Sequence, residues 1–202
     1  AEFYENGAVL IGSKTVSCTL NEVYNNEERD DTCTLDVPII QRDNFDIIGY
    51  NTDPNGKTND NNIDMETHQI NIDNNNNGNK YYAISKRKID ITYDKNGVTS
   101  LTKDSDTCTI WNSATSCEIT TPEITRDGFE IHGYSTNKDA TSESDDLVPH
   151  NSKYSVDENH KYYAITSKYI EDKFYINGAL GLTDVSGKIV NTDVSRSCTI
   201  YN

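Results

Sequence analysis

Three copies of one short signature constrain this chain more than any other feature of its sequence. Each copy opens with an aromatic residue and reaches Asn-Gly three residues later, which places glycines at Gly7, Gly97 and Gly178. Each then reaches Cys-Thr followed by an aliphatic residue, and these cysteines lie 90 residues apart, at positions 18, 108 and 198. Self-similarity at a fixed period predicts a repeat architecture instead of one large domain.

The first two copies also share a second half. A second cysteine leads into Pro, Arg-Asp, Phe and Gly-Tyr over residues 33–50 and again over residues 117–134, and Lys-Tyr-Tyr-Ala-Ile closes each copy at 80–84 and 161–165. We therefore expect repeat modules at 1–88 and 89–169, followed at 170–202 by the front of a third repeat, as in an excerpt from a longer array. The landmarks of this second half include Phe45 and Tyr50 in the first copy and Phe129 and Tyr134 in the second.

The composition agrees with small cores in series. Only 34% of the 202 residues are hydrophobic, but 13 Tyr and 4 Phe are available for packing, whereas globular domains carry about 45–50% apolar residues with glycine included. The formal charge of −15 argues against nucleic acid and anionic lipid as partners, because both need a basic patch. No apolar run reaches the roughly 18 residues that span a bilayer, and residues 1–20 carry no signal-peptide pattern.

The local patterns are those of strands and turns. Asn-Gly between apolar segments indicates a hairpin, since both turn positions need positive φ. Residues 129–134 alternate apolar and polar side chains, and Tyr-Tyr-Ala-Ile is typical of a final strand. No segment of ten or more residues shows a capped helical period. We expect a mainly β fold, α+β at most, with at most a short helical turn in each unit and polar surface loops at 50–80 and 134–161.

The landmarks of the second copy resemble a known family. Pro122, Arg126-Asp-Gly-Phe-Glu-Ile-His-Gly-Tyr134, with Tyr-Asp-Lys-Asn-Gly before them and Tyr-Tyr-Ala-Ile after them, resemble the Listeria–Bacteroides repeat, also called the internalin B-type B repeat. The resemblance implies small β-grasp-like modules strung along a bacterial cell-surface protein as an elongated array. The chain departs from the family in having Tyr50 and Tyr134 where Trp is usual, and in its paired cysteines.

Five cysteines fit a disulfide within each complete copy. We expect Cys18 to pair with Cys33 and Cys108 with Cys117, leaving Cys198 without a partner here. The spacings lack a Cys-x-x-Cys pair and a neighbouring histidine, so zinc is disfavoured. Disulfides imply an oxidising compartment, and the absence of any Asn-x-Ser/Thr sequon favours a prokaryotic protein. We therefore place the protein outside the cell, secreted or on a bacterial surface.

Catalytic motifs are missing around all four histidines, and His132 is expected on the outward face of a strand. No enzyme activity and no cofactor are expected. Two loops imitate the first half of an EF-hand, with candidate calcium ligands Asp53 and Asn55 in one and Asp73 and Asn75 in the other. Both lack an acidic residue at the twelfth position, so plain turns are the favoured interpretation and no metal site is assigned. An intramolecular isopeptide bond stays open.

Two functions follow as hypotheses. The first is a disulfide-stapled stalk of a bacterial adhesin, whose copies contact neighbouring repeats of the same chain. The alternative is that the modules themselves bind a host surface protein or glycan through exposed tyrosines and the Asn/Asp-rich loops.

Overall fold

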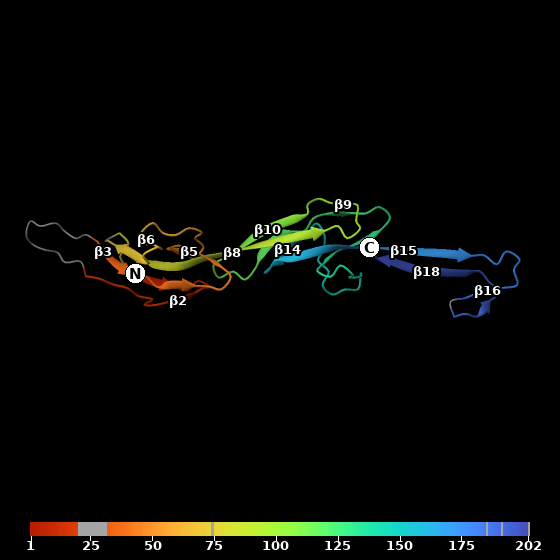
Figure 1. Ribbon diagram of the computed structural model, residues 1–202, viewed down its shortest axis with the longest axis horizontal. Helices are drawn as coiled ribbons and strands as arrows, with labels where there is room; N and C mark the ends of the chain where they lie inside the picture. Colours follow the sequence, from red (N-terminus) through yellow and green to blue (C-terminus); the bar gives the residue numbers. More distant parts are fainter. Residues whose placement is uncertain (20–31, 74, 185, 191, 202) are drawn as a thin grey trace, which may run out of the picture. The chain divides into compact units, whose positions relative to one another are not determined.

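The computed structural model describes residues 1–19, 32–73, 75–184, 186–190 and 192–201, and these residues form strands, turns and loops without any helix (Figure 1). The mainly β class is therefore confirmed, and the absence of helical turns from the described residues agrees with the expected scarcity of helix. Among these residues there is consequently no helix long and apolar enough to cross a membrane.

The chain divides into two compact units. The first comprises Ala1–Ile89 with Cys108–Cys117, and the second comprises Asp90–Thr107 with Glu118–Asn202. These units differ from the expected modules in two segments. Residues 108–117, which belong to the second copy by sequence, lie in the first unit, and the residues after 169 lie in the second unit. Residues 108–117 lie in the first unit because they are hydrogen-bonded to it, as described below. The C-terminal segment lies in the second unit because residues 194–201 pair with residues 167–174.

In the first unit, the main sheet is organised on the long strand β8 (Lys80–Asp94). The first strand, β1 (Glu2–Tyr4), runs parallel to the start of β8 and places Phe3 opposite Tyr81. On the other side, β5 (Asp46–Asn51) runs antiparallel and places Tyr50 opposite Ala83. The first and last strands of the segment 1–88 are thus parallel neighbours.

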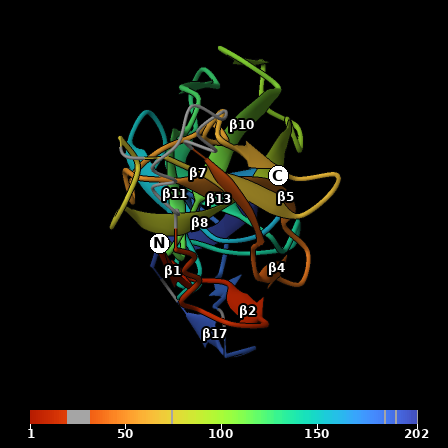
Figure 2. The same ribbon diagram turned by 90° about the vertical axis from the view of Figure 1, so that its left-hand side faces the viewer.

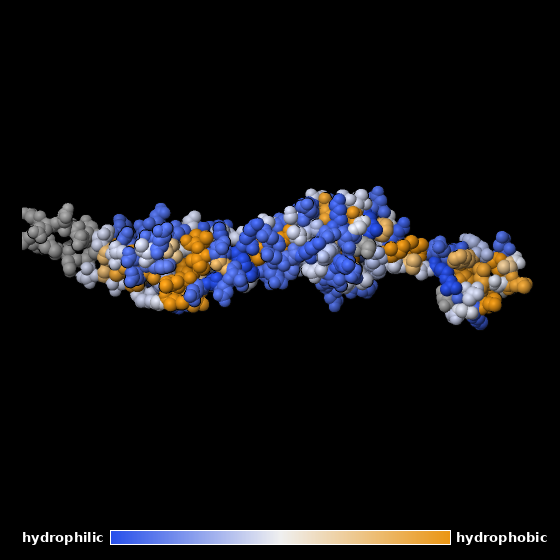
Figure 3. Space-filling view, in the orientation of Figure 1, coloured by the Kyte–Doolittle hydropathy of each residue, from blue (hydrophilic) through white to orange (hydrophobic). Residues whose placement is uncertain are grey.

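Two smaller sheets complete the first unit. The strands β2 (Val9–Ile11) and β4 (Ile39–Gln41) form an antiparallel pair, and their labels lie next to each other in Figure 2. The strands β3 (Cys33–Asp36), β7 (Gln69–Ile72) and β6 (Ile63–Asp64) form the other. Val9, Ile11 and Ile39 point outward from the β2–β4 pair and are exposed, which agrees with the apolar surface near β2 in Figure 3.

The second unit repeats the same pairing. The end of β8 runs parallel to β15 (His160–Phe174) and places Tyr93 opposite Tyr162. The strand β13 (Glu130–Ser135) runs antiparallel to β15 and places Tyr134 opposite Ala164. The smaller pairs are β9 (Ser100–Leu101) with β12 (Ile124–Thr125), and β11 (Cys117–Thr120) with β14 (Lys153–Val156). The pairings of β15 with β8 and with β13 have the same register as those of β8 with β1 and with β5 in the first unit.

The C-terminal segment adds a hairpin to the second unit. The strand β18 (Val194–Tyr201) pairs antiparallel with the end of β15, from Ser167 opposite Tyr201 to Phe174 opposite Val194. The short strands β16 (Leu182–Thr183) and β17 (Ile189–Val190) pair with each other. The strand β10 (Ser105–Trp111), whose residues from Cys108 onward belong to the first unit, likewise pairs with β8.

Each unit has a small aromatic core. In the first, the ring of Phe3 packs edge-on against Tyr50, with centroids 4.9 Å apart, and stacks on Tyr81 at 5.6 Å. In the second, Tyr93 packs against Tyr134 at 5.2 Å and Tyr162 at 6.1 Å. These six rings are at most 5% exposed, so each contributes roughly the 1.5–3 kcal/mol expected for a fully buried large side chain. Aliphatic neighbours, including Leu10, Ile40, Ile63 and Ile70 in the first unit, complete the cores.

The tyrosines of the two Gly-Tyr motifs, Tyr50 and Tyr134, lie at the centre of these cores. The hydroxyl of Tyr50 donates a hydrogen bond to the Pro38 carbonyl at 2.9 Å, and that of Tyr134 donates to the Pro122 carbonyl at 3.2 Å. Because each buried hydroxyl finds a partner, the phenol is accommodated at this position without an unsatisfied polar group. Burial raises the pKa of both phenols well above the usual range.

The Asn-Gly turns form as expected, but the strands around them pair elsewhere. Asn6 and Gly7 have φ of 45° and 88°, and the Asn96-Gly97 and Asn177-Gly178 pairs are also positive at both positions. The amide of Ala8 donates to the Glu5 carbonyl at 2.8 Å, closing the first turn. However, β1 pairs with β8 and β2 pairs with β4, so the predicted simple hairpin of β1 with β2 is wrong. The physical reason is that burial of apolar side chains on these strands outweighs pairing between neighbours in the sequence.

The bulge before each core tyrosine explains the Gly-Tyr motif. The register of β5 shifts between Ile47 and Gly49, and that of β13 shifts between Ile131 and Gly133. These glycines have φ of 136° and 119°, values essentially restricted to glycine. A Cβ on Gly49 would collide with the Asn59 side chain, and one on Gly133 with the Val148 carbonyl oxygen.

Candidate interaction site

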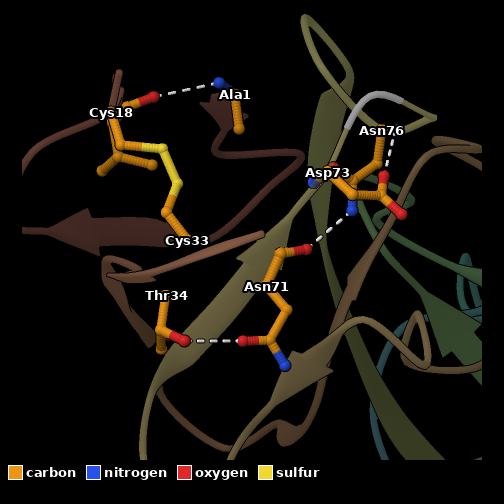
Figure 4. Close-up of a disulfide and its surroundings, with 8 residues drawn as sticks. Ala1, Cys18, Cys33, Thr34, Asn71, Asp73 and Asn76 are labelled. Carbon is orange, nitrogen blue, oxygen red and sulfur yellow. Dashed lines mark hydrogen bonds between the residues drawn. A yellow bond between two sulfur atoms is a disulfide. The ribbon is translucent and has the colours of Figure 1, made fainter. Parts of the chain in front are cut away.

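The two disulfides join the cysteines that the repeat pattern paired. Cys18 is bonded to Cys33 (Figure 4), and Cys108 is bonded to Cys117 across a sequence separation of 9. Cys198 is free and exposed. Two disulfides indicate an oxidising environment. They also place covalent closures on segments that have few apolar residues of their own.

The Cys108–Cys117 disulfide closes a turn that lies in the first unit. We call residues 111–114 the docked turn. Its centre is Asn112, which has a φ of 51° and is only 6% exposed. The Asn112 backbone amide donates to the Ser85 carbonyl at 2.9 Å, and the Ser85 amide donates to Asn112 Oδ1 at 3.3 Å. Asn112 Nδ2 donates to the carbonyls of Pro54 at 2.9 Å and Gly56 at 3.1 Å.

The guanidinium of Arg42 holds the docked turn from another side. It donates to the carbonyl oxygen of Asn112, to Ser85 Oγ at 3.0 Å and to the carbonyl of Ala114 at 3.5 Å. It also lies over the ring of Phe45, 3.4 Å from the centroid. Burial, followed by the charge of nearby Arg87, lowers the pKa of Arg42. Two carbonyl oxygens and an aromatic face therefore compensate for a partly desolvated cation.

Gly7 leaves the space that the docked turn occupies. A Cβ there would lie 2.7 Å from Ser113 Cα and 2.9 Å from the Asn112 carbonyl oxygen. The turn thus rests directly on the backbone of the first Asn-Gly pair. Beside it, the ring of Trp111 lies 5.5 Å from Lys57 Nζ and 6.0 Å from Lys86 Nζ, at cation–π distance. We refer to Gly7, Arg42, Pro54 and Ser85 as the acceptor site.

The second unit places the corresponding residues in the same way. Asn96 Nδ2 donates to the carbonyls of Lys138 at 2.9 Å and Ala164 at 3.1 Å, and in the first unit Asn6 Nδ2 donates to those of Pro54 and Ala83 at 2.8 and 3.0 Å. Arg126 lies 3.6 Å over the ring of Phe129 and donates to Thr166 Oγ1 at 2.7 Å. Phe45 and Phe129, singled out by the repeat pattern, are thus half-buried platforms for these arginines.

The calcium candidates lie in turns whose oxygens already accept backbone hydrogen bonds. Asp53 Oδ1 accepts from the Asn55 amide at 2.9 Å. Asp73 Oδ1 accepts from the amides of Asn75 and Asn76 at 2.8 and 3.0 Å, and the bond from Asn76 is the leading cause that lowers the pKa of Asp73. Figure 4 shows Asp73 and Asn76 next to Asn71, whose carbonyl accepts from Asn76 Nδ2 at 2.7 Å. The described residues hold no cluster of three or more His, Cys, Asp or Glu suited to a metal ion.

Sequence reasoning missed the role of Asn112 and of the arginines. A usable signal was present, because the aromatic-Asn pair follows Cys-Thr-Ile at both 111–112 and 201–202. His132, expected on an outward face, is instead half-buried at the β13 bulge with Nε2 2.7 Å from Ser167 Oγ. The bulge turns its side chain back toward β15.

Comparison of the chain with protein-family models, curated proteins and solved structures finds no match.

Proposed function

We propose that this chain is a non-catalytic stalk region of a secreted or wall-attached bacterial surface protein, built from disulfide-stapled repeats that hold an adhesive region away from the cell. The observation that carries this proposal is the duplicated strand register. Phe3 opposite Tyr81 and Tyr50 opposite Ala83 in the first unit have the same places as Tyr93 opposite Tyr162 and Tyr134 opposite Ala164 in the second. A protein whose length is set by copy number needs such equivalence.

The assignment to the Listeria–Bacteroides repeat is part of the same proposal. Parallel pairing of the first and last strands of each copy supports a β-grasp-like module. The bulged Gly-Tyr motif supports it further, since Gly49 and Gly133 precede the tyrosines that stand where the family usually has Trp. The paired cysteines stay a departure from that family.

The bacterial surface is supported by the disulfides and by the composition. Two covalent closures suit an oxidising, extracellular environment. Units with small cores gain from them, because each loop of this size contributes roughly 2.5–3 kcal/mol on the chain-entropy model. The charge of −15 suits a solvated surface protein.

Small-angle scattering on the oxidised chain tests the stalk. The segments 86–89 and 167–170 lack Gly and Pro and lie within continuous strands, so we expect a narrow distribution of maximum dimensions. The matched control is a variant with four glycines inserted after Lys88, which should broaden the distribution. Equal breadth for the two proteins would exclude a semi-rigid stalk.

The alternative function, direct binding of a host glycan, is favoured by one surface feature. A hollow of about 350 Å³ is lined by Glu2, Phe3, Tyr4, Glu5, Lys14 and Thr15. The exposed ring of Tyr4 stacks on Tyr82 there, with centroids 5.1 Å apart, and an aromatic face beside carboxylates suits a sugar. Saturable binding on a glycan array that is lost in Tyr4→Ala but retained in Tyr154→Ala would favour this alternative.

A further inference from the structure

The second unit carries a counterpart of the acceptor site. Gly97, Arg126, Lys138 and Thr166 take the places of Gly7, Arg42, Pro54 and Ser85. The correspondence is geometric as well as sequential: each arginine stacks on a phenylalanine and donates to a hydroxyl on the last strand of its repeat. Each Asn-Gly asparagine also donates to the long loop and to the last strand of its own copy.

The two arginines differ in what else they bind. Arg42 gives three hydrogen bonds, two of them to carbonyls of the docked turn. Arg126, within the residues that the structure describes, gives one, to Thr166. A guanidinium presents five N–H donors in a fixed fork, so Arg126 retains donors suited to backbone carbonyl oxygens.

The strand that would lead a turn to this counterpart is already present. Cys198-Thr-Ile-Tyr201 matches Cys108-Thr-Ile-Trp111, and β18 places Tyr201 opposite Ser167, the neighbour of Thr166. In the first unit, Trp111 likewise precedes the asparagine that bonds Ser85, the counterpart of Thr166. The Cys198 thiol is free, whereas its counterpart Cys108 closes the docked turn.

We propose that the Gly97–Arg126–Thr166 site is an acceptor for a second turn of the same kind, closed by a disulfide and carried by a further copy of the repeat. The recognised chemistry is an Asn at the tip, whose side-chain amide and backbone bond the last strand and the long loop, followed by carbonyl oxygens for Arg126. The acceptor site of each repeat would then bind the disulfide-closed turn of the next repeat through the same contacts. The inference rests on the proposed repeat array, but its site and its partner are tested without reference to a stalk.

The test adds residues Ser-Ala-Thr-Ser-Cys, the sequence of 113–117, after Asn202 of the 202-residue chain. This extension recreates the docked turn on Cys198, with the nine-residue separation found between Cys108 and Cys117. Because the added turn is tethered to β18, even a weak contact is measurable. A matched extension ending in Ser cannot close. The first unit, which already holds its turn, is the internal control.

Two measurements follow, free thiol content after oxidative refolding and hydrogen exchange of peptides covering 126–131 and 161–168. We expect the Cys198 thiol to disappear and exchange in these peptides to slow about tenfold, as for one or two net hydrogen bonds, with no change in 81–86. Arg126→Lys, which keeps the charge but loses the fork, should remove most of the gain. Gly97→Ala should also remove it, whereas Gly178→Ala, at a φ of 84° with nothing within 4 Å, should not.

Unchanged exchange in 126–131 and 161–168 after disulfide closure would overturn the proposal. So would a free Cys198 thiol in the extended chain, or a gain that survives in both Arg126→Lys and Gly97→Ala. These outcomes are distinguishable from failure of the stalk, which concerns the scattering of the unextended chain. A flexible chain whose acceptor site binds the added turn would contradict the stalk alone. A semi-rigid chain whose site does not bind the turn would contradict this inference alone.

Discussion

At several positions in this protein, the backbone conformation restricts which residue can be present as much as the side-chain chemistry does. Gly49 and Gly133 combine a φ that other residues avoid with close approach of a neighbouring segment. Asn112 combines a positive φ with five hydrogen bonds. At such positions the conformation and the contact restrict the residue together, so substitution removes both.

Gly133→Ala should destabilise the second unit by about 3 kcal/mol or more, because the added Cβ meets the Val148 carbonyl at a φ reserved for glycine. The control is Gly78→Ala, at a φ of 77° with nothing within 4 Å of its Cβ, which should cost about 1 kcal/mol. Urea denaturation followed by tyrosine fluorescence measures both. Equal costs would show that backbone strain alone matters.

Asn112→Gly should destabilise the first unit by about 2–3 kcal/mol. Glycine keeps the positive φ, so the loss comes from the side chain. Its removal takes away the bonds to the Gly56 carbonyl and the Ser85 amide, and one of the two donors to the Pro54 carbonyl, which Asn6 Nδ2 also bonds. Asn177→Gly is the control, since Asn177 has a similar φ of 35° and no side-chain hydrogen bond is seen for it within the described residues. Hydrogen exchange of peptides covering 81–86 gives the difference, and a similar effect of both changes would refute the assigned role of Asn112.

At the level of elements, short strands are stabilised by the turns and disulfides at their ends. The docked turn is covalently closed by Cys108–Cys117 and hydrogen-bonded to the first unit, although it belongs to the second copy by sequence. An element can therefore stabilise a unit other than the one that its sequence position suggests.

The double variant Cys108→Ser/Cys117→Ser should lose about 2.5 kcal/mol on the chain-entropy model for a closed loop of this size. The loss should be visible in the first unit, as faster hydrogen exchange at 81–86. Cys198→Ser, which removes a free exposed thiol, is the control and should leave exchange there unchanged. Faster exchange confined to the second unit would contradict the placement of the docked turn.

For the molecule as a whole, stability at high pH is set by buried phenols. Burial raises the pKa of Tyr162 to about 12 and those of Tyr50, Tyr93 and Tyr134 further above the usual range. Above pH 10 the folded state therefore holds more protons than the unfolded state, so the free energy of unfolding falls as pH rises. It should be constant near pH 8–9 and decline between pH 10 and 12.

Absorbance at 295 nm and circular dichroism over this range check the expectation. The phenols of Tyr50, Tyr93, Tyr134 and Tyr162 should ionise only as the β signal is lost, each contributing a decline of about 1.4 kcal/mol per pH unit once its unfolded pKa is passed. Tyr134→Phe, which cannot ionise, should reduce the slope for the second unit. Ionisation of all 13 tyrosines with the β signal intact would contradict the role assigned to burial.

Features that depend on neighbours along the chain could be predicted from the amino-acid sequence. The Asn-Gly turns, the strands at 129–134 and 161–165, the scarcity of helix and the candidate disulfide pairs follow from residue conformational preference, alternation and repeat spacing. The position of the turn at 111–114 and the groups that Asn112 bonds could not be predicted from these patterns. Its partners are Pro54, Gly56 and Ser85, which are 27 to 58 residues away, and such contacts depend on how non-local strands pair, which no local pattern specifies.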